Sequence, residues 1–361
     1  MKKIILFTAV FALVLGGTAL AADWNFYGSS RMSLFNESQS KDLAANPLTT
    51  NSDNRTTQFY QQGNSRIGAN VAAGDVKGRC EYGPSVNVRL LYGTWHFGSG
   101  EMSVGTMYNP TYYGLSNQVL GTKAGGDQNL LGFGAPFSRL PAIEFKFGGF
   151  KVAAVSPSTG TVFDPTATFA RANVRATLPK IELAYNGAFG PVNLHVSGGW
   201  NSVDFYNAAD NTKAVTSMIG NLMLKYSGGP FMVGGSFQYA KNVGNYNTAA
   251  SVNPVGTVTT AIWTGTELKD TTTMGYTLVA GFTVNDMVGL EAGVGYTVNS
   301  YDSSVATNDD PAMSYYFQVP LTLADGVFII PEISVFDYME DSAKAKEGNQ
   351  VLLGAKFQIN F

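Results

Sequence analysis

The last thirteen residues, 349–361, alternate between two kinds of side chain and end on an aromatic residue. From Val351 to Phe361 the odd positions are apolar, whereas the even positions from Gly354 to Asn360 are glycine or polar. A period of two predicts a β-strand with one apolar and one polar face. Both a soluble sheet and a membrane-spanning barrel contain such strands. The pattern therefore predicts a β-strand, but by itself it does not decide between a soluble sheet and a membrane-spanning barrel.

The first 21 residues are expected to be a secretory signal peptide. Two lysines precede an apolar run over 4–14, and the segment ends in Ala19-Leu20-Ala21. The run is shorter than the roughly 20 residues that a helical membrane span requires, which argues against an anchor. We expect cleavage before Ala22 and export of a mature chain, 22–361.

Composition excludes several classes of protein. The chain is 45% hydrophobic, yet the mature part contains no run of 18 apolar residues, so helical membrane spans are not expected. Its single cysteine, Cys80, cannot form an intramolecular disulfide. Without Lys2 and Lys3, 21 basic residues face 26 acidic ones, a formal charge of −5. This mildly acidic balance argues against a nucleic-acid partner.

No motif in the sequence indicates an enzyme, a cofactor or a metal site. The two histidines, His96 and His195, have neither metal-ligand spacing nor a nucleophile arranged beside them. We therefore expect a protein that is not an enzyme and that carries no cofactor.

The rest of the mature chain divides into similar amphipathic strands, separated alternately by tight turns and by longer polar loops. Strands are expected at 23–35, 57–71, 76–82, 86–97, 102–108, 143–147, 150–152, 181–185, 192–196, 218–226, 231–239, 274–284, 290–298, 313–319, 327–338 and 351–361, with 168–177 as a further possibility. About 16 strands, with short turns at one end and long loops at the other, are typical of bacterial outer-membrane barrels.

Three observations favour a barrel in lipid over a soluble sandwich. Aromatic residues lie near the ends of the apolar faces, as at the two interfaces of a membrane, and these faces carry almost no charge. A signal peptide also occurs together with a terminal aromatic strand. We therefore predict an all-β protein, a transmembrane antiparallel β-barrel. A barrel of about 16 strands encloses an aqueous channel.

The segment 109–140 interrupts the strand pattern. It is rich in glycine and shows no sustained alternation. Compact domains seldom contain an unstructured loop of more than about 15 residues unless the loop has a function. We therefore expect a functional loop between the fifth and sixth strands.

Several short motifs resemble those of the homotrimeric general porins of Gram-negative bacteria. They are Trp24-Asn25-Phe26-Tyr27-Gly28-Ser29-Ser30-Arg31, Asn64-Ser65-Arg66-Ile67-Gly68, Val88-Arg89-Leu90-Leu91-Tyr92-Gly93 and the terminal Phe361. The resemblance implies a homotrimer in the outer membrane, in contact with lipid and lipopolysaccharide, through which small hydrophilic solutes and ions diffuse. It also implies that the last strand is a signal to the barrel-assembly machinery.

In such porins the third external loop folds into the barrel, opposite a wall of basic residues. By resemblance the loop is 109–140, and the wall is Arg31, Arg66, Arg79 and Arg89. The residues support this independently, because each arginine falls on the polar side of its strand and successive strands lie about 4.8 Å apart. The alternative is that the arginines lie at different heights and pair with Glu81, Asp75 or loop carboxylates.

Other residues are candidates for the pore lining. They are Glu81, Asp127, Lys146, Tyr112 and Tyr113. On the strand that contains Arg89, the alternation puts Val88, Leu90 and Tyr92 outward and Asn87 and Trp95 inward. Tyr112, Tyr113 and Trp95 could form an aromatic track for sugars, or they could simply pack the loop.

Two features depart from the general porins. Asp127 is the one acidic residue in the loop, beside Lys123 and Arg139, which favours anions over cations. The second external loop, 83–85, is too short to latch a neighbouring subunit, which weakens the trimer prediction; strands one to five and the closing strand remain the expected interface.

Two classes of function remain open at this point. One is a passive diffusion channel, or a substrate-specific channel for anions or sugars, with the loop inside the lumen. The other is a binding, adhesin or structural barrel, with the loop projecting outward.

Overall fold

The computed structural model describes residues 22–43, 53–119, 127, 130–131, 139–164, 173–206, 212–246, 258–301, 309–341 and 344–361. The segment expected to be a signal peptide, 1–21, lies outside these ranges, so its cleavage stays a prediction. Among the described residues, no helix has the length and apolar character needed to cross a membrane.

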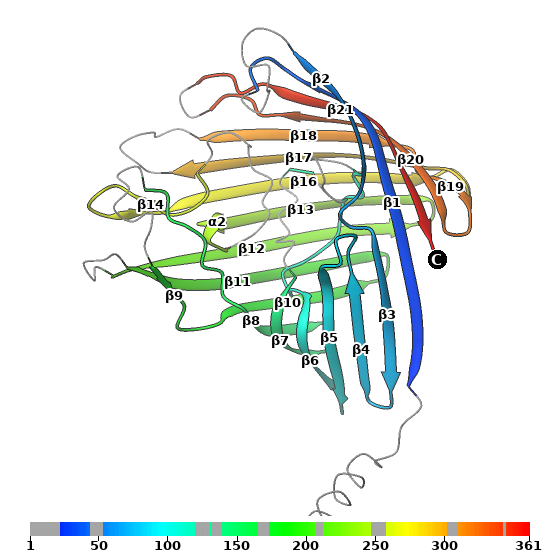
Figure 1. Ribbon diagram of the computed structural model, residues 1–361, viewed down its shortest axis with the longest axis horizontal. Helices are drawn as coiled ribbons and strands as arrows, with labels where there is room; N and C mark the ends of the chain where they lie inside the picture. Colours follow the sequence, from blue (N-terminus) through cyan, green and yellow to red (C-terminus); the bar gives the residue numbers. More distant parts are fainter. Residues whose placement is uncertain are drawn as a thin grey trace, which may run out of the picture.

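The described chain is almost entirely antiparallel β-structure (Figure 1). The main sheet contains β1 (Asp23–Gln39), β2 (Asn54–Gln61), β3 (Arg66–Ala73), β4 (Val76–Tyr82), β5 (Val88–Phe97), β6 (Gly100–Tyr108), β7 (Arg139–Phe147), β8 (Phe150–Val155), β9 (Asn173–Arg175), β10 (Lys180–Phe189), β11 (Val192–Tyr206), β12 (Thr212–Gly228), β13 (Phe231–Lys241), β16 (Thr271–Thr283), β17 (Gly289–Tyr301), β18 (Asp310–Gln318), β19 (Leu321–Ala324), β20 (Val327–Asp337) and β21 (Asn349–Asn360). A separate hairpin, β14 (Ile262–Trp263) and β15 (Leu268–Lys269), and a short helix, α2 (Val243–Tyr246), lie in one long loop.

The sheet closes into a barrel of 16 strands, as predicted. β2 and β3 together form one crossing, because both pair with β1, and β18 and β19 form another against β20. Closure is made by β21, which pairs with β1 from Asn360 opposite Ser29 to Gln350 opposite Gln39. The terminal strand predicted from the sequence is therefore the one that joins the two ends of the sheet.

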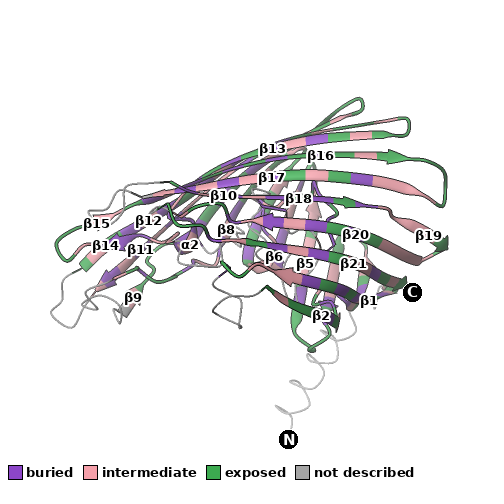
Figure 2. Cartoon of the chain, turned by 90° about the horizontal axis from the view of Figure 1, so that it is seen from above, coloured by how far each residue is buried: buried purple, intermediate pink, exposed green. Residues whose placement is uncertain are grey.

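The apolar faces of the strands point outward. The aromatic residues expected at strand ends are all exposed on the surface: Trp24, Tyr226, Phe231, Tyr239 and Phe361. Figure 2 shows buried and exposed segments alternating along the strands. In water such a surface would be costly, whereas in a bilayer it faces hydrocarbon and the interfacial region. The outward face is therefore built to contact lipid.

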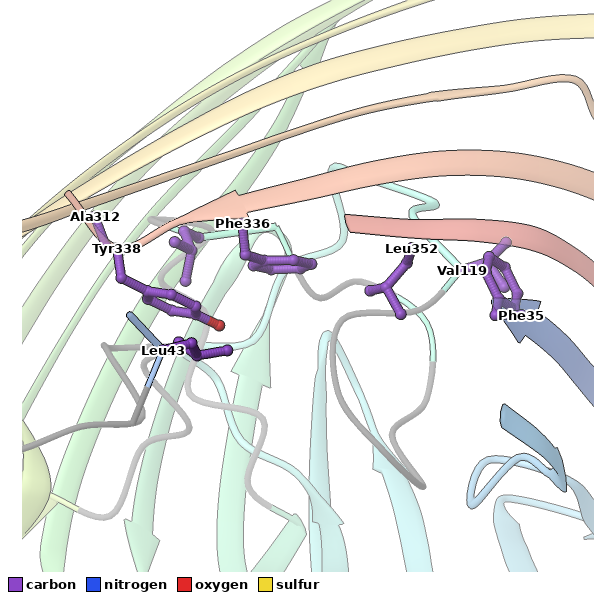
Figure 3. Packing of buried hydrophobic residues seen from close by; sticks show 8 residues of the cluster. Phe35, Leu43, Val119, Ala312, Phe336, Tyr338 and Leu352 are labelled. Atoms are coloured by element: carbon purple, nitrogen blue, oxygen red, sulfur yellow. The ribbon is translucent and has the colours of Figure 1, made fainter. Parts of the chain in front are cut away.

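Apolar side chains also pack inside the barrel, near the end with the long loops. Phe35, Phe336 and Leu352 point inward from β1, β20 and β21 and meet Val119 and Leu131 of the loop after β6 (Figure 3). Each fully buried side chain of this size contributes about 1.5–3 kcal/mol relative to exposure to water. The lumen is therefore partly filled by a hydrophobic core that the loop completes.

Two details of the predicted strands are wrong. The strand expected over 57–71 is broken between β2 and β3, where a turn brings the side chain of Gln62 to the backbone oxygen of Val119 at 3.1 Å. In β5 a register shift opposite Glu81 and Tyr82 changes which side chains face inward. As a result Leu90 is buried, and Trp95 is exposed beside Phe97 on the outer surface, which is the reverse of the prediction. Tyr92, also predicted to face outward, packs against the buried cluster that contains Met107.

Candidate pore constriction

The described residues of the loop after β6, 109–119, 127 and 130–131, lie inside the barrel, and this loop is called the constriction loop here; β7 begins at Arg139, so the loop ends before the predicted residue 140. Its first residues are held by Glu182, which projects from β10 and is fully buried. The side chains of Asn109 and Thr111 donate hydrogen bonds to the Glu182 carboxylate, both at 2.9 Å. A buried carboxylate needs such donors, because unpaired it would cost several kcal/mol.

Two further carboxylates hold the loop farther along the wall. Glu291 on β17 accepts hydrogen bonds from the backbone N–H and the side-chain amide of Asn117, at 2.9 and 2.6 Å. Glu332 on β20 accepts one from the backbone N–H of Val119 at 2.6 Å. With Glu182 they form a set that we call the loop-holding carboxylates. Sequence reasoning missed them, although each is a single acid between outward apolar neighbours on its strand, which could have drawn attention to it.

The loop also packs against the wall through a small apolar cluster. Tyr113, Leu115 and Leu130 of the loop meet Met223, Val279 and Tyr316 of the strands. Burial raises the pKa of Tyr113, so its hydroxyl stays protonated and serves as a hydrogen-bonding group.

The tyrosines proposed as a sugar track are mostly packing residues. The Tyr113 ring lies 5.2 Å from that of His195, and Tyr112 stacks on Tyr108 at 4.6 Å. Trp95, the third member, lies on the outer surface. The structure therefore does not bring the three rings together in the lumen.

The far part of the loop returns to the first and last strands through Asp127. Its carboxylate lies 2.8 Å from Nη1 of Arg31 on β1 and 3.0 Å from Nζ of Lys356 on β21. The acid that could have given the loop a free negative charge is thus shared between two cations. Lys356 was not among the residues predicted for the site.

Three of the four predicted arginines converge on one carboxylate. Glu81, fully buried on β4, lies 2.7 Å from Nε of Arg89, 3.2 Å from Nη2 of Arg79 and 3.6 Å from Nη1 of Arg66. Tyr27 also donates its hydroxyl to Glu81 at 2.9 Å. The guanidinium groups of these three arginines therefore lie close together and are paired with Glu81, whereas Arg31 is paired with Asp127 of the loop.

Positive charge exceeds negative charge on this side of the lumen. The cationic residues, called the basic wall, are Arg31, Arg66, Arg79, Arg89, Arg139 and Lys356. Against these six stand three carboxylates, Glu81, Asp127 and Glu332, the last of which interacts electrostatically with Lys356, and this leaves an excess of three charges. Arg31 interacts electrostatically with Arg66 and Arg89, and Arg139 with Arg89. Charges this close act within the screening length of about 8 Å at physiological salt.

Lys146 lies apart from the basic wall. It pairs with Glu101 at 3.3 Å, and it lies one residue before the end of β7, next to the tight turn that joins β7 to β8. The structure therefore places it at the end of the barrel with the short turns, away from the constriction loop.

A closed 16-stranded barrel with an inward-folded loop is the architecture of the outer-membrane porins, and the chain has this fold. No protein-family model matches the sequence, and neither does any curated protein. The outer-membrane channel DcaP of Acinetobacter baumannii is similar in structure, with a TM-score of 0.66 and 15% identity over 95% of this chain and 99% of that one. OmpT of Vibrio cholerae is similar with a TM-score of 0.57 and 14% identity over 94% of this chain and 98% of that one. An anion-selective porin from Comamonas acidovorans is similar with a TM-score of 0.55 and 14% identity over 94% of this chain and 100% of that one.

Replacing Asp127 with asparagine should free part of the constriction loop. The substitution removes the ion pairs with Arg31 and Lys356 and raises the local charge excess by one. We expect larger current fluctuations through single channels and a higher preference for anions. A planar-bilayer recording measures both; quiet channels with unchanged selectivity would contradict the role of Asp127 as the attachment of the loop. Asp286→Asn, in the exposed turn between β16 and β17, is the matched control.

Proposed function

We propose that this protein is an outer-membrane channel for the passive diffusion of small hydrophilic solutes and ions. The position of the constriction loop supports this proposal, because the loop is bonded to the inner wall by Glu182, Glu291 and Glu332 rather than presented to the exterior. An adhesin or binding barrel would require an outward-projecting loop at this place, and none of the contacts of the described part of the loop favours that.

The basic wall supports a second part of the proposal, that the channel prefers anions to cations. In the constriction loop only Asp127 is acidic, and it is paired with Arg31 and Lys356. The loop-holding carboxylates accept hydrogen bonds from the loop itself. The charge excess of the basic wall therefore lacks an opposing row of carboxylates on the loop, and it raises the local concentration of anions.

The same proposal includes the membrane, the oligomeric state and the assembly of the channel. The outward aromatic surface suits a bilayer, and the long loops suit the lipopolysaccharide side of the outer membrane. We propose a homotrimer that associates through β1 to β6 and β21, with assembly by the barrel-assembly machinery guided by the terminal strand. The expectation that the protein is not an enzyme stays a prediction, and a sugar-specific channel is not favoured, since the aromatic track is not assembled.

The test is a planar-bilayer recording of the purified protein under a tenfold gradient of potassium chloride. We expect large, stable conductance steps, grouped in threes for a trimer, and a reversal potential with the sign of chloride permeation. Folded protein that gives no steps would contradict the channel, whereas steps with a cationic reversal potential would contradict only the anion preference.

A further inference from the structure

A second segment folds into the barrel beside the constriction loop. After β13, α2 turns inward, and Asn245 accepts a hydrogen bond from the backbone N–H of Ala261 at 2.8 Å and donates one to the backbone oxygen of Thr161 at 2.9 Å. Asn201, on the inner face of β11, donates to the backbone oxygen of Ser158 at 3.0 Å. Parts of two long loops are therefore joined to each other and to the wall, and we call the stretch 242–246 with 258–263 the inner flap.

Tyr246 is the residue of the inner flap that reaches deepest. Its side chain is fully buried, and its hydroxyl donates a hydrogen bond to Glu182 at 2.8 Å. The ammonium group of Lys180 donates to the Tyr246 backbone oxygen at 2.9 Å and lies 4.1 Å from the centre of its ring. A Cβ at Gly199 would come within 1.8 Å of the hydroxyl, so only glycine at this place on β11 admits the tyrosine.

Glu182 is shared by the inner flap and the constriction loop. One carboxylate oxygen accepts from the Tyr246 hydroxyl and the Asn109 amide, and the other accepts from the backbone N–H and hydroxyl of Thr111. Because the carboxylate is fully buried, no solvent can replace a donor that leaves. Loss of one donor therefore leaves the carboxylate underbonded and changes how strongly it holds the others.

We infer that Tyr246 is a positioning residue for the constriction loop, and that the inner flap sets the position of the loop's first residues through Glu182. The consequence for permeation, a wider constriction when the flap is released, rests on the proposed channel function. The coupling between the two segments does not depend on it.

The flap is also bonded to the neighbouring strands where it begins, at the end of β13. Asn242, at its start, donates to the backbone oxygen of Thr216 at 2.9 Å and to Asp270 at 2.7 Å. Asp270 also pairs with the partly exposed Lys241 at 2.6 Å. A contiguous path of bonded residues thus runs from the end of β13 through Asn242 and Tyr246 to Glu182.

Hydrogen exchange on the folded protein tests the coupling directly. Tyr246→Phe keeps the ring and removes only the donor to Glu182, so the barrel should form, as checked by heat-modifiable migration on a gel. We expect amide exchange in 109–119 to become about tenfold faster, the change expected when a hydrogen bond to a charged group is lost. Thr264→Ala, in the exposed turn before β15, is the matched control and should leave this segment unchanged. Unchanged exchange in Tyr246→Phe would overturn the inference.

A double-mutant cycle separates coupling from simple loosening. Thr111→Val removes a donor to Glu182 from the constriction loop, and the two substitutions should combine non-additively because they act on one carboxylate. Additive effects on exchange would show two independent attachments and overturn the inference.

Liposome swelling then measures the effect on permeation. The rate for a disaccharide relative to a monosaccharide should rise in Tyr246→Phe, and an unchanged ratio would overturn the effect on constriction width. Wild-type protein that admits neither sugar would instead contradict the proposed channel, while the exchange experiments would still decide the coupling.

Discussion

Neutralising the predicted arginines together should abolish the preference for anions. The variant replaces Arg31, Arg66, Arg79 and Arg89 with glutamine, which keeps an amide donor for Glu81. Two cations, Arg139 and Lys356, then face three carboxylates, and the positive excess of three charges becomes a deficit of one. We expect the ratio of anion to cation permeability in potassium chloride to fall to roughly 1 or below, because the remaining charges within the screening length are no longer positive on balance. The reversal potential under a salt gradient measures this ratio.

Replacing the four arginines one at a time should lower the ratio of anion to cation permeability by smaller amounts. Arg79 is the most exposed of the four, with 34% of its side chain accessible, so Arg79→Gln should have the largest effect with the least damage to packing. Arg175→Gln, at a largely exposed arginine on β9 that pairs with Asp204 on β11, serves as the control for a charge removed elsewhere. A quadruple variant that folds, as judged by gel migration, and retains its preference would mean that other charges govern selectivity.

The general plan of the fold could be predicted because it depends on local alternation. In β1 the apolar Trp24 and Phe26 face outward and Tyr27 and Arg31 face inward, as expected from a period of two. The same alternation located the closing strand and put four arginines of the wall on the polar side of their strands, although it did not find Arg139. Each of these predictions needed only the residue sequence of one strand.

The errors arose where alternation is interrupted. The register shift between β4 and β5 exchanges the sides of Leu90 and Trp95, and no residue in β5 signals it clearly in advance. The turn at 62–65 breaks an otherwise regular strand because Gln62 gains a partner on the constriction loop. Both deviations depend on contacts between segments that are distant in the sequence, which a pattern within one strand does not contain.

The loop attachments were missed for the same reason. Glu182, Glu291 and Glu332 look like ordinary polar residues of a lumen, and their role depends on where 109–119 lies in three dimensions. Phe35 and Leu352 point inward against the rule of a polar lumen, since the constriction loop supplies apolar partners for them. Likewise the inner flap has no sequence signature, because its order comes from individual bonds of Asn245 and Tyr246.

Removing the carboxylate at the centre of the basic wall should have the opposite effect on selectivity and a large effect on stability. Among the residues that the structure describes, Glu81 is the one acid within 4.0 Å of three guanidinium groups, and its side chain has no exposed surface. Glu81→Gln removes the charge and leaves Arg66, Arg79 and Arg89 close together without compensation. Breaking a buried ion pair by removing one partner costs about 3–5 kcal/mol. We therefore expect a clear drop in the temperature at which the barrel unfolds.

The same variant should favour anions more strongly than the wild type. The local excess rises from three charges to four, and the released side chains of Arg79 and Arg66 gain freedom to reach into the water-filled lumen. Thermal unfolding followed by gel migration measures the first effect, and the reversal potential of the surviving channels measures the second. An unfolding temperature equal to the wild type would show that Glu81 does not organise the wall, and a lower anion preference would show that the arginines need Glu81 to face the pore at all. The arginine and glutamate variants thus move selectivity in opposite directions from one cluster, a result that a general loss of packing would not produce.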